Sequence, residues 1–160
     1  METTIRRAQP RDAGGILDLL KQVLNLHAEI RPDIFIKGTA KYTREQLLGI
    51  MANENTPVFV ACAGDGKIKG YVFCEIIPPV PSNNMKSVKT LYIDDLCVDG
   101  NCRGERVGTK LFNYAKEFAK ETGCYNLTLN VWEGNDGAAA FYKNMGMFPR
   151  KTQMEIILNK

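Results

Sequence analysis

The stretch YIDDLCVDGNCRGERVGTKLFNYAKEFAK, from Tyr92 to Lys120, decides the fold. It begins as an apolar strand, passes through a turn that contains Gly100, Gly104 and Gly108, and continues as an amphipathic helix. The start of a helix leaves several backbone N–H groups without partners, and the helix dipole adds roughly half a positive charge there. Small residues let an anion approach these N–H groups. The order strand, glycine turn, helix therefore predicts a phosphate-binding site.

Three cationic side chains, Arg103, Arg106 and Lys110, surround this turn. The first 100 residues carry 12 basic and 12 acidic side chains, and the last 60 carry 9 against 6, so the whole net charge of +3 lies in the part with the turn. A total of +3 is too small for a general nucleic-acid binder, and we expect no nucleic-acid partner. The turn has neither the Walker A pattern nor the GxGxxG pattern of dinucleotide sites. It could also be a tight turn that uses glycine for backbone geometry alone.

The rest of the 160-residue chain alternates helical and strand patterns, which is typical of one α/β domain. Thr43 and Gln46 form a capping-box pattern before a helix at 44–52, and Gly-Asp-Gly-Lys at 64–67 predicts a hairpin turn. Strands are expected at 3–8, 58–63, 68–77, about 88–98, 125–131 and 154–158. The other helices are expected from about 12 to 27, from the glycine turn to about 122, and at 135–145.

Composition points to a reducing compartment and to no metal site. The five cysteines are odd in number, and none has the Cys-x-x-Cys spacing of a zinc or redox site. His27 is the only histidine in the sequence, which excludes a site built from several histidines. The start of the chain is charged, and no apolar stretch reaches the ~18 residues of a membrane span. We therefore expect a cytoplasmic protein without a membrane partner.

Two motifs resemble those of the GNAT superfamily of N-acetyltransferases. The turn from Arg103 to Gly108 resembles the R/Q-x-x-G-x-G/A pattern of its motif A, and NDGAAAFY from Asn135 to Tyr142, followed by NMGM at 144–147, resembles motif B. The order of the expected elements agrees over nearly the whole chain. The resemblance implies an α/β (α+β) fold with a mixed, mostly antiparallel central sheet flanked by about four helices, in a single N-acetyltransferase domain over residues 1–160.

The resemblance also implies the reaction, in which acetyl-CoA donates an acetyl group to a primary amine by direct attack in a ternary complex. The main chain of Leu96, Cys97 and Val98 is expected to pair with the pantetheine arm. The other residues expected to contact CoA are Arg103, Gly104, Glu105, Arg106, Val107, Gly108, Thr109, Asn135 and Tyr142. Asn135 could instead, or in addition, cap its helix. Tyr142 is the candidate general acid for the leaving thiolate, or an aromatic that packs on its helix.

Three carboxylates are candidates for the general base. Asp94 and Asp95 are successive in a predicted strand, so we expect them on opposite faces of the sheet, with one reaching the acceptor pocket. This pair resembles an acidic pair in diamine acetyltransferases that helps to receive a polyamine. Glu75 on the neighbouring strand is the third candidate. Each of them could instead face solvent or pair with a lysine. In the similar acetylases that modify the N-termini of ribosomal proteins, a catalytic glutamate lies on the strand after the motif A helix. The corresponding residue here is Asn130, which cannot act as a base, and this weakens the hypothesis that the acceptor is a protein N-terminus.

Arg106 departs from the family pattern, which has glycine at this position. We expect it in a right-handed helical conformation, because the left-handed one costs on the order of 1–2 kcal/mol. The departure motivates an alternative function, a non-catalytic acetyl-CoA sensor or interaction module with the same fold. The acceptor stays open between a small amine, a polyamine-like molecule and a peptide. A homodimer is possible because dimers are common in the superfamily.

Overall fold

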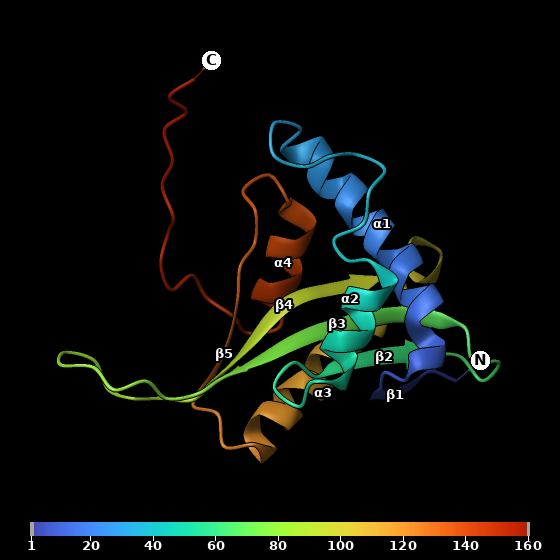
Figure 1. Ribbon diagram of the computed structural model, residues 1–160, viewed down its shortest axis with the longest axis horizontal. Coiled ribbons are helices and arrows are strands. Elements are labelled where there is room, and N and C mark those ends of the chain that lie inside the picture. Colours follow the sequence, from blue (N-terminus) through green and yellow to red (C-terminus); the bar gives the residue numbers. More distant parts are fainter. Residues whose placement is uncertain (1, 160) are drawn as a thin grey trace. The chain divides into compact units, whose positions relative to one another are not determined.

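The computed structural model describes residues 2–159, which form five strands, four α-helices and two short 3-10 turns (Figure 1). The described residues divide into two compact units, one ending at Asn130 and the other beginning at Val131. The first unit contains all five strands and three of the helices, and the second contains the fourth helix. No described helix is long and apolar enough to cross a membrane.

The sheet of the first unit has the strand order β1-β2-β3-β4-β5. Neighbouring strands run antiparallel from β1 to β4, and β5 runs parallel to β4. The bounds are β1 Thr4–Arg7, β2 Val58–Cys62, β3 Ile68–Ile77, β4 Thr90–Val98 and β5 Asn126–Leu129. The expected mixed, mostly antiparallel sheet is confirmed.

Helices cover both faces of this sheet, with α1 (Ala13–Ile30) and α2 (Arg44–Ala52) on one face and α3 (Val107–Glu121) on the other (Figure 1). Successive residues of β3 show this division, because side chains alternate between the faces of a strand. Tyr71 is fully buried in the core cluster shared with α1 and α2. A Cβ atom on the preceding residue, Gly70, would lie 2.9 Å from Leu111 of α3. The fourth helix, α4, spans Asp136–Asn144.

A β-bulge interrupts the pairing of β3 with β4 at the acidic pair. Phe73 is opposite Asp95, but the next residue of β3, Cys74, is opposite Ile93, so Asp94 is an extra residue in β4. An extra residue breaks the alternation of side chains along the strand. The prediction that Asp94 and Asp95 face opposite sides is therefore wrong: both make their contacts with groups on the side of α1 and α2.

The strand predicted at residues 154–158 is also wrong, since no strand is assigned there in the described chain. The pattern Met-Glu-Ile-Ile-Leu has high strand propensity, but propensity describes how side chains suit a pleated surface and does not supply a neighbouring strand. Elsewhere the differences are at element ends. The first helix continues three residues past His27 to Ile30, and β5 is shorter than the 125–131 predicted.

Candidate functional site

The glycine turn after β4 takes two left-handed backbone positions before α3 begins. Gly104 has φ of 88°, and Arg106 has φ of 60° and ψ of 27°. The expectation of a right-handed Arg106 is therefore wrong. The chain has to reverse direction directly before Val107, the first residue of α3, and this geometry requires a positive φ that glycine adopts without cost. The backbone at Arg106 thus has a conformation typical of glycine, although the residue carries an arginine side chain.

An ion pair ties this turn to the sheet. Lys69 of β3 lies with its Nζ 2.7 Å from Oε1 of Glu105 and donates a second hydrogen bond, of 3.1 Å, to Oγ1 of Thr3. The side chain of Lys69 is buried, and its hydrogen bond holds the pKa of Glu105 below its ordinary value. The carboxylate of Glu105, although 43% exposed, is thereby engaged by Lys69. Its remaining contribution to anion binding is its backbone N–H.

Cationic side chains lie next to the first backbone N–H groups of α3, which have no hydrogen-bond partner within the helix. Arg103, Arg106 and Lys110 have exposed side chains, while Val107 is buried beneath them. Gly108 and Thr109 are half-buried in the first turn of the helix, which contains no acidic residue. An anion placed here meets the positive end of the helix dipole without an opposing carboxylate in that turn. The geometry suits the phosphate site predicted from the sequence.

Among the described strands, β5 leaves one edge of β4 unpaired next to this turn. β5 pairs with β4 from Thr90 to Ile93 only, so Leu96, Cys97 and Val98 lie beyond the described pairing with β5. An open strand edge presents N–H and C=O groups to which an extended chain can pair. Burial raises the pKa of the Cys97 thiol to about 12, and its Sγ lies 3.7 Å from the carbonyl oxygen of Leu19. A thiol held in this form is not a nucleophile at neutral pH.

Asp94, the bulged residue, contacts the loop between α1 and α2. Its Oδ2 lies 2.8 Å from Nζ of Lys41 and accepts a hydrogen bond of 3.2 Å from the hydroxyl of Tyr42. Burial alone would lower the pKa of Lys41, but the hydrogen bond and charge of Asp94 outweigh it and raise that pKa. Lys41 and Asp94 are 45% and 30% exposed, so this ion pair is open to water and to competing ions.

Asp95 lies deeper than its neighbour. Its Oδ2 accepts a hydrogen bond of 2.6 Å from the hydroxyl of Tyr71, which is fully buried in β3. Burial raises the pKa of Asp95 to about 6, and burial followed by the charge of Asp95 raises the pKa of Tyr71 well above its ordinary value. The ring of Tyr71 packs edge-on against Phe73, which stacks with Tyr42. One aromatic group thus connects the surroundings of both carboxylates.

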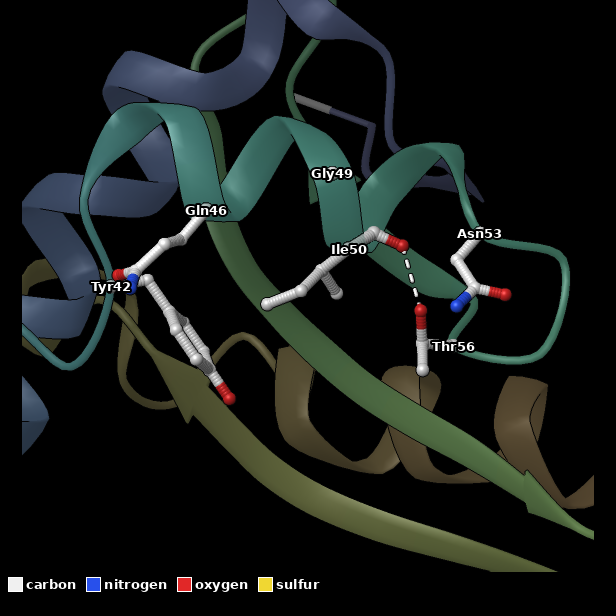
Figure 2. Close-up of a pocket in the computed structure, with 6 residues that line it drawn as sticks. All are labelled: Tyr42, Gln46, Gly49, Ile50, Asn53 and Thr56. Carbon is white, nitrogen blue, oxygen red and sulfur yellow. Dashed lines mark hydrogen bonds between the residues drawn. The ribbon is translucent and has the colours of Figure 1, made fainter.

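A pocket of about 400 Å³ lies along α2 and includes Tyr42 in its wall. Figure 2 shows Tyr42 at one end and Asn53 and Thr56 at the other, with the hydroxyl of Thr56 donating to the carbonyl of Ile50 over 2.8 Å. The lining residues are Tyr42, Gln46, Gly49, Ile50, Asn53 and Thr56, none of which carries a charge. Tyr42 also donates a hydrogen bond to Asp94, so this one residue lies between the pocket and the acidic pair.

The other candidates from the sequence make their described hydrogen bonds and ring contacts with other groups. Glu75 is exposed and is opposite Tyr92 in the β3–β4 register. Tyr92 accepts a hydrogen bond of 3.2 Å from the amide of Asn130. His27 lies with its ring 5.2 Å from that of Phe35, and burial lowers its pKa. None of these contacts is a hydrogen bond or ion pair with Asp94 or Asp95, although burial and then the charge of Asp94 raise the pKa of Tyr92.

Sequence reasoning missed the neighbours of the acidic pair. Lys41 and Tyr42 lie in a loop without a recognisable pattern, about fifty residues before Asp94. Tyr71 lies opposite Cys97 in the register of β3 with β4, and the hairpin turn predicted at 64–67 joins β2 to β3, so it carried no signal for this pairing. The β-bulge orients Asp94 and Asp95 toward these groups, and no pattern in the sequence predicted it.

The second unit carries the two candidates of the second motif. Asn135 caps α4, since its side-chain oxygen accepts the N–H of Ala138 over 3.3 Å. The capping function considered for Asn135 is therefore present. Tyr142 lies within α4, half-buried, with its ring 5.1 Å from that of Phe141.

Comparison with known proteins places these features in a family. The model of the "Acetyltransferase (GNAT) family" matches residues 20–147. An N-acetyltransferase of Methanocaldococcus jannaschii is 33% identical over 106 residues, which cover 66% of this chain and 45% of that protein. The match thus spans less than half of that relative. Glucosamine 6-phosphate N-acetyltransferase 1 of Dictyostelium discoideum is 25% identical, with 74% of this chain and 76% of that protein covered.

A third relative is the thialysine N-epsilon-acetyltransferase of Mus musculus, 24% identical, with 90% of this chain and 83% of that protein covered. Among solved structures, a mutant of the BH1408 protein of Bacillus halodurans superposes with a TM-score of 0.93 at 30% identity, covering 98% of this chain and 99% of that one.

Proposed function

The chain belongs to the acetyltransferase (GNAT) family and is an acyltransferase, and we propose that it transfers the acetyl group of acetyl-CoA to the primary amine of a small cationic molecule. The amine attacks the thioester directly in a ternary complex. The acidic pair that the bulge turns to one side of the sheet carries this proposal.

The glycine turn and the open edge of β4 support the donor side. The exposed side chains of Arg103, Arg106 and Lys110 suit the phosphates of CoA. The backbone of Arg106 is left-handed, as a glycine at this position of the turn could be. The free edge at Leu96, Cys97 and Val98 suits the amide groups of the pantetheine arm, which can pair as an added strand does. In such a complex the same backbone would donate to the thioester oxygen as negative charge develops on it.

Asp94 supports a cationic acceptor, because it already holds an ammonium group. Nζ of Lys41 occupies this carboxylate at 2.8 Å. A half-exposed ion pair of this kind contributes only ~0–1 kcal/mol, so an ammonium on the acceptor can replace Lys41 at little cost. The uncharged pocket beside Tyr42 would take the rest of the molecule. The Dictyostelium and mouse relatives are named for glucosamine 6-phosphate and thialysine, small molecules that each carry a primary amine, which agrees with a small amine as acceptor; the phosphate of the first means that only the second supports a cationic one.

Asp95 is the carboxylate best suited to remove the proton. A free amine has a pKa near ~10 and is protonated at neutral pH, so it has to lose a proton before it attacks. Asp95 has a pKa of about 6, close to the value that favours a general base at neutral pH. Tyr142 keeps the role that the family motif implies, as the proton donor to the CoA thiolate.

The test is steady-state release of CoA thiol from acetyl-CoA with a panel of diamines, amino acids, aminoglycosides and peptides. We expect turnover with small cationic amines. Asp95→Asn should lower kcat/KM by about 10²–10⁴. Because Asp95 takes up a proton as the pH falls, wild-type kcat/KM should decrease below about pH 6, and this decrease should be absent in Asp95→Asn. Asp94→Asn should raise KM for cationic acceptors.

Glu75→Gln is the matched control, since it removes an exposed carboxylate from the neighbouring strand. It should keep the wild-type pH profile; if it removes the acid limb while Asp95→Asn retains it, Glu75 is the base and our assignment is wrong. Tyr142→Phe separates an enzyme from an acetyl-CoA sensor. A loss of kcat with unchanged acetyl-CoA affinity supports catalysis, whereas absence of turnover with every acceptor, despite acetyl-CoA binding, would contradict the proposed function.

A further inference from the structure

One amine of the chain itself lies in the proposed acceptor site. Lys41, in the loop between α1 and α2, places its Nζ 2.8 Å from Oδ2 of Asp94 and 5.4 Å from the centre of the Tyr42 ring. Tyr42 donates its hydroxyl to the same carboxylate over 3.2 Å and stacks on Phe73 of β3. The ammonium of Lys41 therefore has a defined position in the folded protein, at the carboxylate that we assign to the ammonium of the acceptor.

Lys41 also interacts electrostatically with the proposed general base. Burial alone would lower the pKa of Lys41, but the hydrogen bond and charge of Asp94, and then the charge of Asp95, raise it. Burial raises the pKa of Asp95 to about 6, against the hydrogen bond from Tyr71 and the charge of Lys41, which lower it. The amine and the base thus act on each other within one site.

The donor side of the site is close along the same strand. Asp94 stands two residues before Leu96, where the edge of β4 that β5 leaves unpaired carries the proposed pantetheine contacts, and two strand residues span about 7 Å. Lysine carries its amine on a flexible four-carbon stem, and the side chain of Lys41 is 45% exposed. An amine tethered in this way has an effective concentration of roughly millimolar or more, so it competes with free acceptors that are scarce.

We propose that the protein acetylates Nζ of its own Lys41 when acetyl-CoA is bound and no free acceptor competes. This inference rests on the proposed acetyltransferase function. The lone pair of Nζ attacks the carbonyl carbon of the thioester, a C–N bond forms, and the C–S bond breaks. The ammonium loses two protons in total: one passes through Asp95 to solvent, and the other replaces the proton that Tyr142 gives to the CoA thiolate.

This modification removes the positive charge that occupies Asp94. The nitrogen of an acetylated lysine is neutral, so it forms no ion pair, and Asp94 becomes available to the ammonium of an acceptor. Acetyl-CoA without acceptor would thereby prepare the site for a cationic amine. Because the ion pair that is lost is half-exposed, we expect an increase in acceptor affinity of about two- to fivefold.

The experiment is intact-mass and peptide mass spectrometry of the full chain after incubation with acetyl-CoA alone. We expect one acetyl group per chain, on Lys41, formed at a rate that does not change with protein concentration, as an intramolecular reaction requires. Lys37 is the internal control, because it is an exposed lysine of the same loop that non-enzymatic acetylation would also modify. Lys41→Arg keeps a cation at this position and should remove the acetyl group. Asp95→Asn should slow its formation about 10²-fold or more.

Steady-state kinetics then measure the effect on the acceptor site. Incubation with acetyl-CoA before the assay should lower KM for diaminobutane about two- to fivefold in the wild type and leave it unchanged in Lys41→Arg. An acetylated wild type that keeps the KM of the unmodified protein would contradict the release of Asp94.

The outcomes separate this inference from the function on which it rests. Turnover of small amines with Lys41 unmodified would overturn self-acetylation and leave the proposed function standing. Equal acetylation of Lys37 and Lys41, or an unchanged rate in Asp95→Asn, would show a non-enzymatic reaction and overturn it as well. If neither turnover nor acetylation of Lys41 occurs, both proposals are wrong.

Discussion

Arg106 has a left-handed backbone conformation, the only one at a non-glycine residue between residues 2 and 159. For a residue with a Cβ atom this conformation costs on the order of 1–2 kcal/mol. Strain of this kind concentrates at functional sites, where the surrounding structure holds it in place. Here the constraint is the approach to α3, whose first N–H groups form the proposed anion site. The exposed guanidinium adds a positive charge at the same place.

Replacing Arg106 with glycine should therefore stabilise the fold. The left-handed cost disappears, while the greater freedom of glycine in the unfolded chain removes part of the gain, which leaves ~0.5–1 kcal/mol. The measurement is the free energy of unfolding in urea. Arg103→Gly is the matched control, because Arg103 has φ of −65° and loses the same charge from the same turn. It should destabilise by ~0.5–1 kcal/mol, and equal effects of the two variants would contradict the strain at Arg106.

At the scale of elements, the distance between α3 and the sheet determines where the glycine turn lies. Gly70 lets α3 approach β3 closely, next to the point where β4 enters the turn. A Cβ atom there would lie 2.7 Å from the carbonyl oxygen of Cys97, 2.9 Å from Leu111 and 3.3 Å from Val107. The first of these neighbours is backbone of β4 and cannot move aside as a flexible side chain can. The close contact thus holds the strand, the turn and the helix in one arrangement.

Gly70→Ala should lower the free energy of unfolding by ~1–3 kcal/mol, because the added methyl overpacks this contact. Thermal or urea unfolding measures the change. Gly49→Ala provides a comparison within the same chain. Gly49 lies in α2 with nothing within 4 Å of an added Cβ, so alanine should stabilise the protein by ~0.5–1 kcal/mol. Should Gly70→Ala prove neutral, the close packing of α3 on β3 would not be what positions the turn.

At the scale of the whole molecule, two carboxyl groups, that of buried Asp12 and that of half-buried Asp95, make stability depend on pH in opposite directions. Asp12, before α1, accepts hydrogen bonds of 2.7 and 3.0 Å from the guanidinium of Arg6 and one of 2.8 Å from the N–H of Gln9. The hydrogen bond from Arg6 holds the pKa of Asp12 below its ordinary value. Asp95, in contrast, has its pKa raised by burial to about 6. One carboxylate supports the fold, and the other weakens it at neutral pH.

The sign of each effect follows from proton linkage. The folded state binds the Asp95 proton more tightly than the unfolded chain does, so its contribution to stability falls as the pH rises from about 4 through 6, by at most ~3 kcal/mol. Asp95→Asn should remove this decrease and gain stability relative to wild type at pH 7–8, with the gain fading toward pH 4. Asp12→Asn should cost ~1–3 kcal/mol at neutral pH, with the loss shrinking as acid protonates wild-type Asp12.

Urea unfolding of the wild type and both variants across this pH range checks the prediction. The two differences from wild type should have opposite signs at pH 7–8 and should both become smaller in acid. A pH-independent difference for Asp95→Asn would show that this carboxyl is not destabilised by burial. If Asp95 is the general base, Asp95→Asn should be more stable and less active than the wild type. This trade-off between stability and activity is expected where a catalytic carboxylate is destabilised by burial.

Interactions between near neighbours made most elements predictable from the amino-acid sequence. The capping box of Thr43 and Gln46 is present, with hydrogen bonds of 2.9 and 3.2 Å, and the hairpin turn at 64–67 closes between Ala63 and Lys67. The glycine turn lies between β4 and α3 as expected. These signals extend over a few residues, so a short window of sequence contains the whole cause. The family motifs are equally local, and the comparisons confirm the family.

Pairing between distant residues decided the rest. The sequence marked Asp94 and Asp95 as candidates, but the register of β3 against β4 placed both on one side of the sheet, and a loop fifty residues away supplied Lys41 and Tyr42. Residues 154–158 have a strand pattern, yet no strand forms there in the described chain, since a strand depends on a neighbour for its backbone hydrogen bonds. Local energies select the conformation of a segment, whereas long-range pairing selects its partners, and the acidic site exists only through those partners.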